Sequence, residues 1–501
     1  MNGSRESDRV VVPEKPSNKG KAGNPSAPAE KVEERTLAKE NSRWQITSRA
    51  QHRKRVQSAL SRVRRAAKED RGRRFTTLLH HVYSPDTLLE AYLSLKRDAA
   101  PGVDGVTWYD YEGGLEGRLQ DLSERLKRGA YRARPVKRRY IPKPDGRQRP
   151  LGITALEDKI VQMAMTMVLN QVYEVDFKGF SYGFRPRRSQ HNALDAVVVG
   201  IESRRVRWVL DADISGFFDA IDHERLIELV ERRISDQRVI RLIRKWLKAG
   251  VLDDGELVHS EKGTPQGGCI SPLLANIYLH YVLDTWIHEW RTKECRGDVI
   301  VVRYADDFVM GFEDRAEAER CLEALRERLR GYGLALHPDK TKLIEFGRHT
   351  IEDDSDGGPG KPKTFNFLGF THISARGRTG RFRVERRTMK KRMRAKLREI
   401  KLELRRRMHE PIPEVGKWLG SVVKGHMQYY GVPLNWKALS SFRWRIGWLW
   451  QKTLNRRSHK ANVTWDRMKR YIKRWLPEPK ICHPFPSQRL GVKIQGRSPV
   501  R

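Results

Sequence analysis

The feature that most constrains this chain is a pair of adjacent aspartates between two apolar runs. Residues 301–305 precede Asp306 and Asp307, and residues 308–310 follow them. Two apolar runs with a polar break are typical of a β-hairpin, so we expect the aspartates at its tip. Crowding two like charges beside a core is unfavourable unless a cation compensates them. The segment predicts a cation-binding hairpin, whereas a single aspartate at a strand end is more often a solvated turn or a helix cap.

A second acidic segment, residues 208–219, has a similar character. Strand alternation places Asp211 and Asp213 on one face and apolar neighbours on the other. Phosphoryl transfer to a growing strand uses two divalent ions about 4 Å apart, and Mg²⁺ prefers carboxylate oxygens and phosphates. Aspartates on two strands that converge would satisfy this chemistry. Together, the two segments predict a nucleotidyl-transfer site.

Three boxes, in order along the chain, carry a resemblance to a known family. Tyr304 to Asp307 match the Tyr-Ala-Asp-Asp signature of reverse transcriptases, and the segment around Asp213 resembles the motif that supplies the other metal-binding aspartate. Residues 263–277 are similar to the family's Pro-Gln-Gly box. Further segments resemble group II intron-encoded proteins: 100–106, 149–153, 181–186, 217–223, 334–342 and 367–369. The resemblance covers about residues 75–480 and implies an RNA-directed DNA polymerase.

The resemblance also implies a catalytic set with two Mg²⁺ ions. In this family the metal-binding aspartate precedes an aromatic gate by five residues, which selects Asp213 over Asp211 and makes Phe218 the gate. Phe218 would lie under the sugar and exclude a 2′-hydroxyl; its alternative is an ordinary core residue. The expected catalytic and metal-binding residues are Asp213, Asp306 and Asp307, with the carbonyl of Ile214.

Four further residues are expected to bind the nucleotide. Lys143 and Arg149 flank a predicted turn, so their charges could converge on a triphosphate. Gln266 lies between a proline and two glycines, which permit close backbone approach to a ligand. By resemblance, Lys340 lies near the leaving pyrophosphate and could donate a proton there. The alternative for these cations is a solvated surface position.

The expected fold is α+β: a right-hand polymerase with fingers, a palm of antiparallel sheet packed on helices, and an α-helical thumb. Strand signals lie at 136–142, 149–153, 206–214 and 299–304, and helical patterns at 155–175, 222–249 and 272–290. The expected divisions are a disordered basic and polar tail at 1–42, fingers and palm at 43–380, a thumb resembling the maturase X domain at 381–455, and a basic nucleic-acid-binding segment at 456–501.

The charge predicts a polyanionic partner. Lys and Arg number 100 against 62 Asp and Glu, a net charge of +38. Residues 385–409 hold twelve Lys or Arg against three Glu and have the pattern of an amphipathic helix with one basic face. Trp residues between 436 and 475 are expected mainly in a core, with base stacking as the alternative. The expected nucleic-acid contacts are Arg386, Arg387, Lys390, Lys391, Arg394, Arg398 and Arg405.

The expected partners are group II intron RNA, an RNA template with a DNA primer, dNTPs and target DNA. No run approaches ~18 apolar residues, so no membrane partner is expected. The four cysteines form no C-x-x-C pair, which argues against zinc or disulfides and favours the cytoplasm of a bacterium. Cys482 has no nearby cysteine, so we expect no His/Cys-rich endonuclease domain.

Other readings remain open at this stage. One is a reverse transcriptase independent of introns, used in defence or repair. Another is a non-catalytic splicing factor, although Asp213, Asp306 and Asp307 are all present. A generic basic RNA-binding protein would leave the acidic pair without a role. Ribozyme sequence flanking the gene would favour the intron reading.

Overall fold

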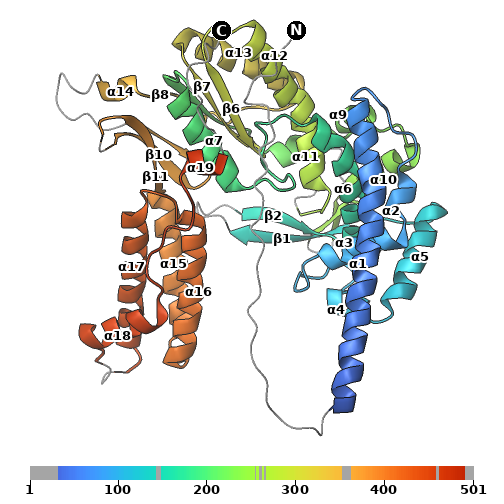
Figure 1. The fold of residues 1–501 in the computed structure, drawn as a ribbon, viewed down its shortest axis with the longest axis horizontal. Helices are drawn as coiled ribbons and strands as arrows, with labels where there is room; N and C mark the ends of the chain where they lie inside the picture. The colour runs from blue at the N-terminus through green and yellow to red at the C-terminus, as the bar shows by residue number, and fades with distance from the viewer. Residues whose placement is uncertain are drawn as a thin grey trace.

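The computed structural model describes residues 32–142, 148–253, 256–258, 262–263, 267–352, 363–377, 379–458 and 462–490. Over these residues, helices surround small, mostly antiparallel sheets, which confirms the α+β fold (Figure 1). The fingers, palm and thumb expected from the sequence correspond to the N-terminal helices with a β-hairpin, a central sheet, and a C-terminal helical bundle. None of the helices described is long and apolar enough to cross a lipid bilayer.

The fingers are built around α6 (Leu156–Asp176), which α1 (Val32–Glu69) and α3 (Pro85–Ser94) contact. Ile160, Ala164 and Val168 recur every fourth residue on α6 and are fully buried, which confirms the predicted helix. Helix α1 begins inside the segment 1–42, so the expected tail is wrong from residue 32 onward, where Lys, Glu and Ala favour a helix. The remaining helices here are α2 (Leu79–Val82), α4 (Trp108–Glu112) and α5 (Leu115–Lys127).

A β-hairpin extends from the fingers toward the C-terminal helices (Figure 1). Strand β1 (Val136–Pro142) pairs antiparallel with β2 (Gln148–Ile153), as predicted, and parallel with β4 (Val251–Asp253). Strand β5 (Glu256–Val258) completes this sheet, whose order is β2-β1-β4-β5. The hairpin therefore carries Arg149 on β2, which is an edge strand of this sheet.

The palm sheet has the order β6-β7-β3-β8, with all neighbours antiparallel. Val209 packs in a core with α7 (Gln190–Ser203), whereas its neighbour Leu210 packs in the core that includes α13 (Arg315–Gly331). Both faces of the sheet are thus covered, which explains why its strands read as apolar runs rather than alternating patterns. The strands are β3 (Trp208–Asp213), β6 (Val299–Tyr304), β7 (Asp307–Phe312) and β8 (Lys342–Glu345).

Helices predicted as single units are interrupted. The pattern at 222–249 divides where Asp236, 2% exposed, caps α10 and accepts the backbone N–H groups of Leu78 and Leu79. The pattern at 272–290 runs through a single π-helical turn, His280–Asp284. These elements are α8 (Phe217–Ala220), α9 (His223–Glu231), α10 (Gln237–Lys248), α11 (Ser271–Leu279) and α12 (Thr285–Lys293), followed beyond α13 and β8 by α14 (His349–Glu352).

The thumb, α15 to α18, follows a three-stranded sheet of β9 (Thr364–Phe367), β10 (Phe370–Arg376) and β11 (Phe382–Thr388). The basic helix predicted at 385–409 begins only at Lys390, because its first residues end β11. Met468 of α18 is fully buried in the thumb core, so residue 456 does not divide the thumb from a separate segment. The helices are α15 (Lys390–Arg406), α16 (Ile412–Tyr430), α17 (Trp436–Leu454) and α18 (Trp465–Trp475).

The chain then returns from the thumb to the palm. Helix α19 (Pro486–Leu490) packs against α7, and Figure 1 shows it in red beside that helix. Arg489 Nε lies 3.0 Å from Asp195 Oδ2, and Asp195 is 1% exposed. The backbone N–H of His483 donates to the carbonyl of Gly431. The thumb is consequently attached to the palm both before α15 and after α18.

Candidate active site

The acidic residues converge on neighbouring strands of the palm. In the register of β3 and β7, Asp213 lies directly opposite Asp307. The two carboxyl groups are close enough to share a hydrogen bond. Asp306 immediately precedes Asp307 in the turn that joins β6 and β7. The structure thus brings together the three aspartates that the sequence selected.

The hairpin tip has a constrained backbone. Tyr304 pairs with Asp307, which leaves Ala305 and Asp306 as the two turn residues. Ala305 adopts a positive φ of 58°, a conformation that costs a residue with a Cβ roughly 1 kcal/mol. Gly183 lies so close that a Cβ there would be 2.3 Å from the Ala305 nitrogen. The turn therefore depends on a neighbouring segment that only glycine can complete.

The carboxylates disfavour one another's ionisation. Burial raises the pKa of Asp211 to about 7, and the neighbouring Asp213 contributes to the increase. Burial and then the Asp306 carboxylate raise the pKa of Asp307. Burial also raises the pKa of Asp306, whereas Arg149 and Lys340 oppose the increase. This concentration of negative charge favours a bound cation.

Lys340 supplies one such cation. Its Nζ lies 2.5 Å from Asp213 Oδ2, although the side chain is about half exposed. The segment that carries Lys340 is anchored to β3, because the backbone N–H of His337 donates to the Asp213 carbonyl. The sequence placed Lys340 near the pyrophosphate, and the structure places it against an expected metal ligand.

The fingers approach the same site. Arg149, on β2, opposes the increase in the pKa of Asp306. A Cβ on Gly267, where φ is +125°, would be 2.3 Å from the carbonyl oxygen of Gly152 on β2. The loop of the Pro-Gln-Gly box therefore touches the strand that carries Arg149. Lys143 and Gln266 themselves lie outside the described residues.

Phe218 lies just beyond β3 on the short helix α8. It is partly buried, and its ring packs edge-on against that of Phe217 with the ring centroids 5.4 Å apart. Ile214, whose carbonyl was expected in the metal shell, is 2% exposed and forms a β-bridge with Leu336. The placement of Phe218 five residues after Asp213 is compatible with a gate, but its contacts alone are those of a half-buried aromatic residue.

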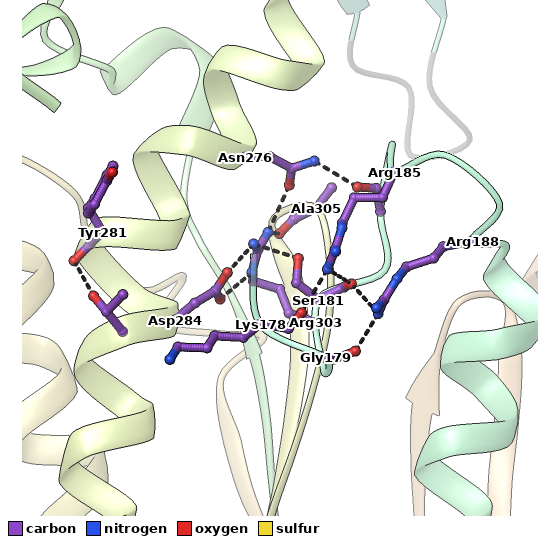
Figure 2. Close-up of polar contacts among 12 residues, drawn as sticks. Lys178, Gly179, Ser181, Arg185, Arg188, Asn276, Tyr281, Asp284, Arg303 and Ala305 are labelled. Atoms are coloured by element: carbon purple, nitrogen blue, oxygen red, sulfur yellow. Dashed lines mark hydrogen bonds and ion pairs between the residues drawn. The ribbon is translucent and has the colours of Figure 1, made fainter. Parts of the chain in front are cut away.

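A buried arginine supports the hairpin from behind. Arg303 and Asp284 are both 0% exposed, and Arg303 Nε and Nη2 donate to the two carboxylate oxygens at 2.7 and 2.5 Å. Nη1 donates to the Ala305 carbonyl at 2.9 Å and to Asn276 Oδ1 at 3.1 Å, and Nη2 also donates to Ser181 Oγ (Figure 2). All five N–H donors of the guanidinium are therefore used.

The network connects four segments around the turn. Asn276 Nδ2 donates to the Gly183 carbonyl, which holds the glycine segment against Ala305. The π-helical turn ends at Asp284 and so carries the partner of Arg303. Arg185, 5% exposed, fixes the other end of the glycine segment by donating to the Ser181 carbonyl (Figure 2). The turn that carries Asp306 is thus supported by a buried network of hydrogen bonds.

Sequence reasoning assigned no role to Arg303, Asp284 or Asn276. A usable signal was present, because Arg303 stands within an apolar strand and an arginine is rarely fully buried without a partner. Its partner Asp284 lies within the predicted helix at 272–290, but the pattern does not indicate that this residue faces Arg303, so the pair could not be identified. These residues touch the turn rather than the expected metal site, and we regard them as positioning residues.

The expected nucleic-acid surface needs one correction. Arg386 is 3% exposed, lies on β11 and donates to Asp195 at 2.6 Å, so the prediction that it contacts nucleic acid is wrong. Arg387 is exposed but pairs with Glu385. The other five expected residues lie on α15 and are largely exposed: Lys390, Lys391, Arg394, Arg398 and Arg405.

The donor set fits a hard divalent cation. Among the described residues, no three His, Cys, Asp or Glu side chains form a ready-made metal-binding group. Magnesium at polymerase sites is commonly held by one or two carboxylates together with substrate phosphates and water. Asp213, Asp306 and Asp307 offer such carboxylates, with the ammonium of Lys340 compensating one of them. A site of this kind would be completed by the nucleotide.

Comparison with known proteins gives three findings. Residues 141–372 match a family described as reverse transcriptase (RNA-dependent DNA polymerase). Protein YkfC of Escherichia coli (strain K12) is 38% identical over 355 residues, which cover 64% of this chain and 88% of that protein. The group II intron-encoded protein LtrA of Lactococcus lactis subsp. cremoris is 38% identical over 235 residues, 47% of this chain and 39% of LtrA. This chain therefore matches most of YkfC but well under half of LtrA.

Breaking the buried ion pair should destabilise the palm. Asp284→Asn leaves the Arg303 charge buried without its counter-ion, which should lower the free energy of unfolding by about 3–5 kcal/mol. The exposed pair of Asp121 with Arg125 provides a matched control, and Asp121→Asn should cost less than about 1 kcal/mol. Urea unfolding of the full chain measures both variants. Equal stability of the two variants would contradict the structural role of the pair.

Proposed function

This chain belongs to the reverse transcriptases of the group II intron-encoded type, and from that membership we propose that it copies an RNA template into DNA at the site of Asp213, Asp306 and Asp307. The observation that carries the proposal is the β3–β7 register, which sets Asp213 opposite Asp307 beside the turn residue Asp306. Neither a non-catalytic splicing factor nor a generic RNA-binding protein gives these carboxylates a common task. The intron-independent and non-catalytic readings remain the alternatives that the experiments below address.

Enzymes of this family use divalent metal ions, and we propose two Mg²⁺ ions here. When bound, they would activate the attacking hydroxyl and neutralise the leaving pyrophosphate. Asp213, Asp306, Asp307 and the carbonyl of Ile214 would hold them. Lys340 would exchange its contact with Asp213 for one with the pyrophosphate and donate a proton there. Lys340 would thus compensate the charge of Asp213 before the nucleotide enters, and the bound metal would compensate it afterwards.

The nucleotide would bind between the hairpin and the palm. Arg149, which opposes the increase in the pKa of Asp306, would contact the triphosphate of the incoming dNTP together with Lys143. Gln266 would position the nucleotide or the template from the loop whose Gly267 touches β2. Phe218 would close the space next to the 2′ position of the sugar. The fingers thus would supply cations for the phosphates, and the palm would supply carboxylates for the reaction.

The nucleic-acid partners follow from the charge and the family. We propose an RNA template with a DNA primer, held partly by exposed cations on α15, and the host intron RNA as a second partner. Target DNA would enter during intron mobility. Fingers and palm would comprise residues up to about 388, and the thumb helices α15 to α18 would follow. YkfC and LtrA are bacterial proteins, and we propose a bacterial cytoplasmic location.

Removing one carboxylate should abolish polymerisation but not nucleic-acid binding. Asp306→Asn should reduce primer extension on an RNA template by at least about a thousand-fold, because the lost charge is needed in the transition state. RNA affinity should stay within twofold, since the basic surface is unchanged. Asp298→Asn, just before β6, is the matched control and should polymerise normally. Full activity of Asp306→Asn would refute the site.

Phe218 should control the choice of sugar. Phe218→Ala opens space next to the 2′ position, so the preference for dNTPs over rNTPs should fall about ten- to a hundred-fold, the scale of a relieved steric clash. Phe218→Tyr retains the ring and should retain the preference. Ratios of kcat/KM for a matched dNTP and rNTP measure the effect. An unchanged ratio for Phe218→Ala would remove Phe218 as the gate.

The protein should accelerate splicing of the intron that flanks its gene. At low Mg²⁺ the RNA fold is poorly neutralised, so a strongly basic protein that recognises its shape should raise the splicing rate at least about ten-fold. Asp306→Asn should support splicing as the native protein does, because phosphate contacts do not involve the carboxylates. Absence of acceleration, or of flanking ribozyme sequence, would leave only the polymerase part of this proposal.

A further inference from the structure

A small cavity opens between the C-terminal ends of α15 and α17. These helix ends point away from the palm and lie near α18 (Figure 1). Its volume is about 100 Å³, well below the roughly 300–1,000 Å³ of a pocket for a drug-sized ligand. A space of this size admits one flat group at most. We call it the thumb cavity, and it is lined by Lys401, Arg405, Met408, Trp448, Leu449, Lys452, Thr453 and Arg456.

The thumb cavity is surrounded by positive charge that the protein does not compensate. Lys401, Arg405, Lys452 and Arg456 are exposed, and none of them forms an ion pair with the residues that the structure describes. The adjacent Arg407, in contrast, pairs with Glu403 and Glu410. Cations near helix C-termini interact favourably with the helix dipole, but that accounts for charge on each helix separately, not for its convergence on a cavity.

An exposed tryptophan forms part of the same wall. Trp448 is 40% exposed, whereas Trp450, two residues further along α17, is fully buried in the thumb core. The Lys452 Nζ lies 3.8 Å from the centroid of the Trp448 ring, so the ring already holds a cation against its face. The expectation that these tryptophans mainly form core is wrong for Trp436, Trp444 and Trp448, which are all exposed. The exposed surface of Trp448 instead faces a basic cavity.

We propose that the thumb cavity binds an unpaired nucleotide of single-stranded RNA, with its base stacked on Trp448 and its flanking phosphates held by the four cations. An aromatic platform beside a basic surface is the usual means of binding single strands, and stacking tolerates any base. A duplex offers no free base face to a cavity of this size. The inference rests on the proposed binding of intron RNA and assigns to that RNA a contact separate from the polymerase site.

The test measures binding of a short single strand to the full-length protein while the polymerase site is filled. The protein is first saturated with an unlabelled RNA–DNA primer–template duplex, and fluorescence anisotropy then follows a labelled hexauridine RNA. Trp448→Ala should weaken hexamer binding about five- to a hundred-fold, because a base loses its stacking partner. Trp448→Phe should recover most of the affinity. Trp436→Ala removes a comparably exposed tryptophan from the other end of α17 and should change binding less than twofold.

The role of the cations is tested separately by removing charge. Lys401→Gln with Lys452→Gln should weaken hexamer binding and flatten its salt dependence, whereas Lys417→Gln with Lys424→Gln, exposed on α16, removes equal charge away from the cavity and should have a smaller effect. Unchanged affinity in Trp448→Ala, an equal loss in Trp436→Ala, or tighter binding of a DNA hexamer would overturn the proposal. Primer extension and splicing by the same native protein report separately on the proposed function.

Discussion

The arrangement of the palm depends on a charge that has been removed from water. Burying an ion pair adds little net stability compared with an apolar pair of similar size, but a partly satisfied one is very costly. Arg303 meets that constraint only when Asp284, Asn276, Ser181 and the carbonyl of Ala305 all lie in place at once. The requirement turns four separate segments into one unit. The turn that carries the mutually repelling aspartates is thereby held in place by this network.

Much of the acidic site could be predicted because its chemistry is visible in the sequence. Two adjacent aspartates inside apolar runs indicated the hairpin, and a second acidic strand indicated its partner. The register that sets Asp213 opposite Asp307 could not be predicted, since it depends on packing on both faces of the sheet. The same limit explains the error at Arg386. Counting charge over 385–409 combined the end of a strand with a helix, and a strand residue with the wrong orientation was assigned to a helical face.

In the thumb, the position of each tryptophan around its helix decides whether it is buried, although all tryptophans count equally in the composition. Trp450 lies four residues from Ile446, so both point into the core, whereas Trp448 shares its face with Trp444 and Lys452. The sequence contained this periodicity, but a count of tryptophans conceals it. The periodicity of one helix does not, however, show which other helix packs beside it. The cavity exists because the cations of α15 lie beside the tryptophan of α17, and that adjacency is a property of the bundle alone.

The return of the chain to α7 has a mechanical consequence. A helical bundle joined to its neighbour by one strand could swing in any direction about that joint. The returning segment binds the bundle through His483 on Gly431 and binds the palm through Arg489 on Asp195, so it adds a second connection between the two. This second connection restricts how far the bundle can swing. A nucleic-acid strand that advances along the bundle would therefore meet a surface that keeps nearly the same position relative to the palm at each step.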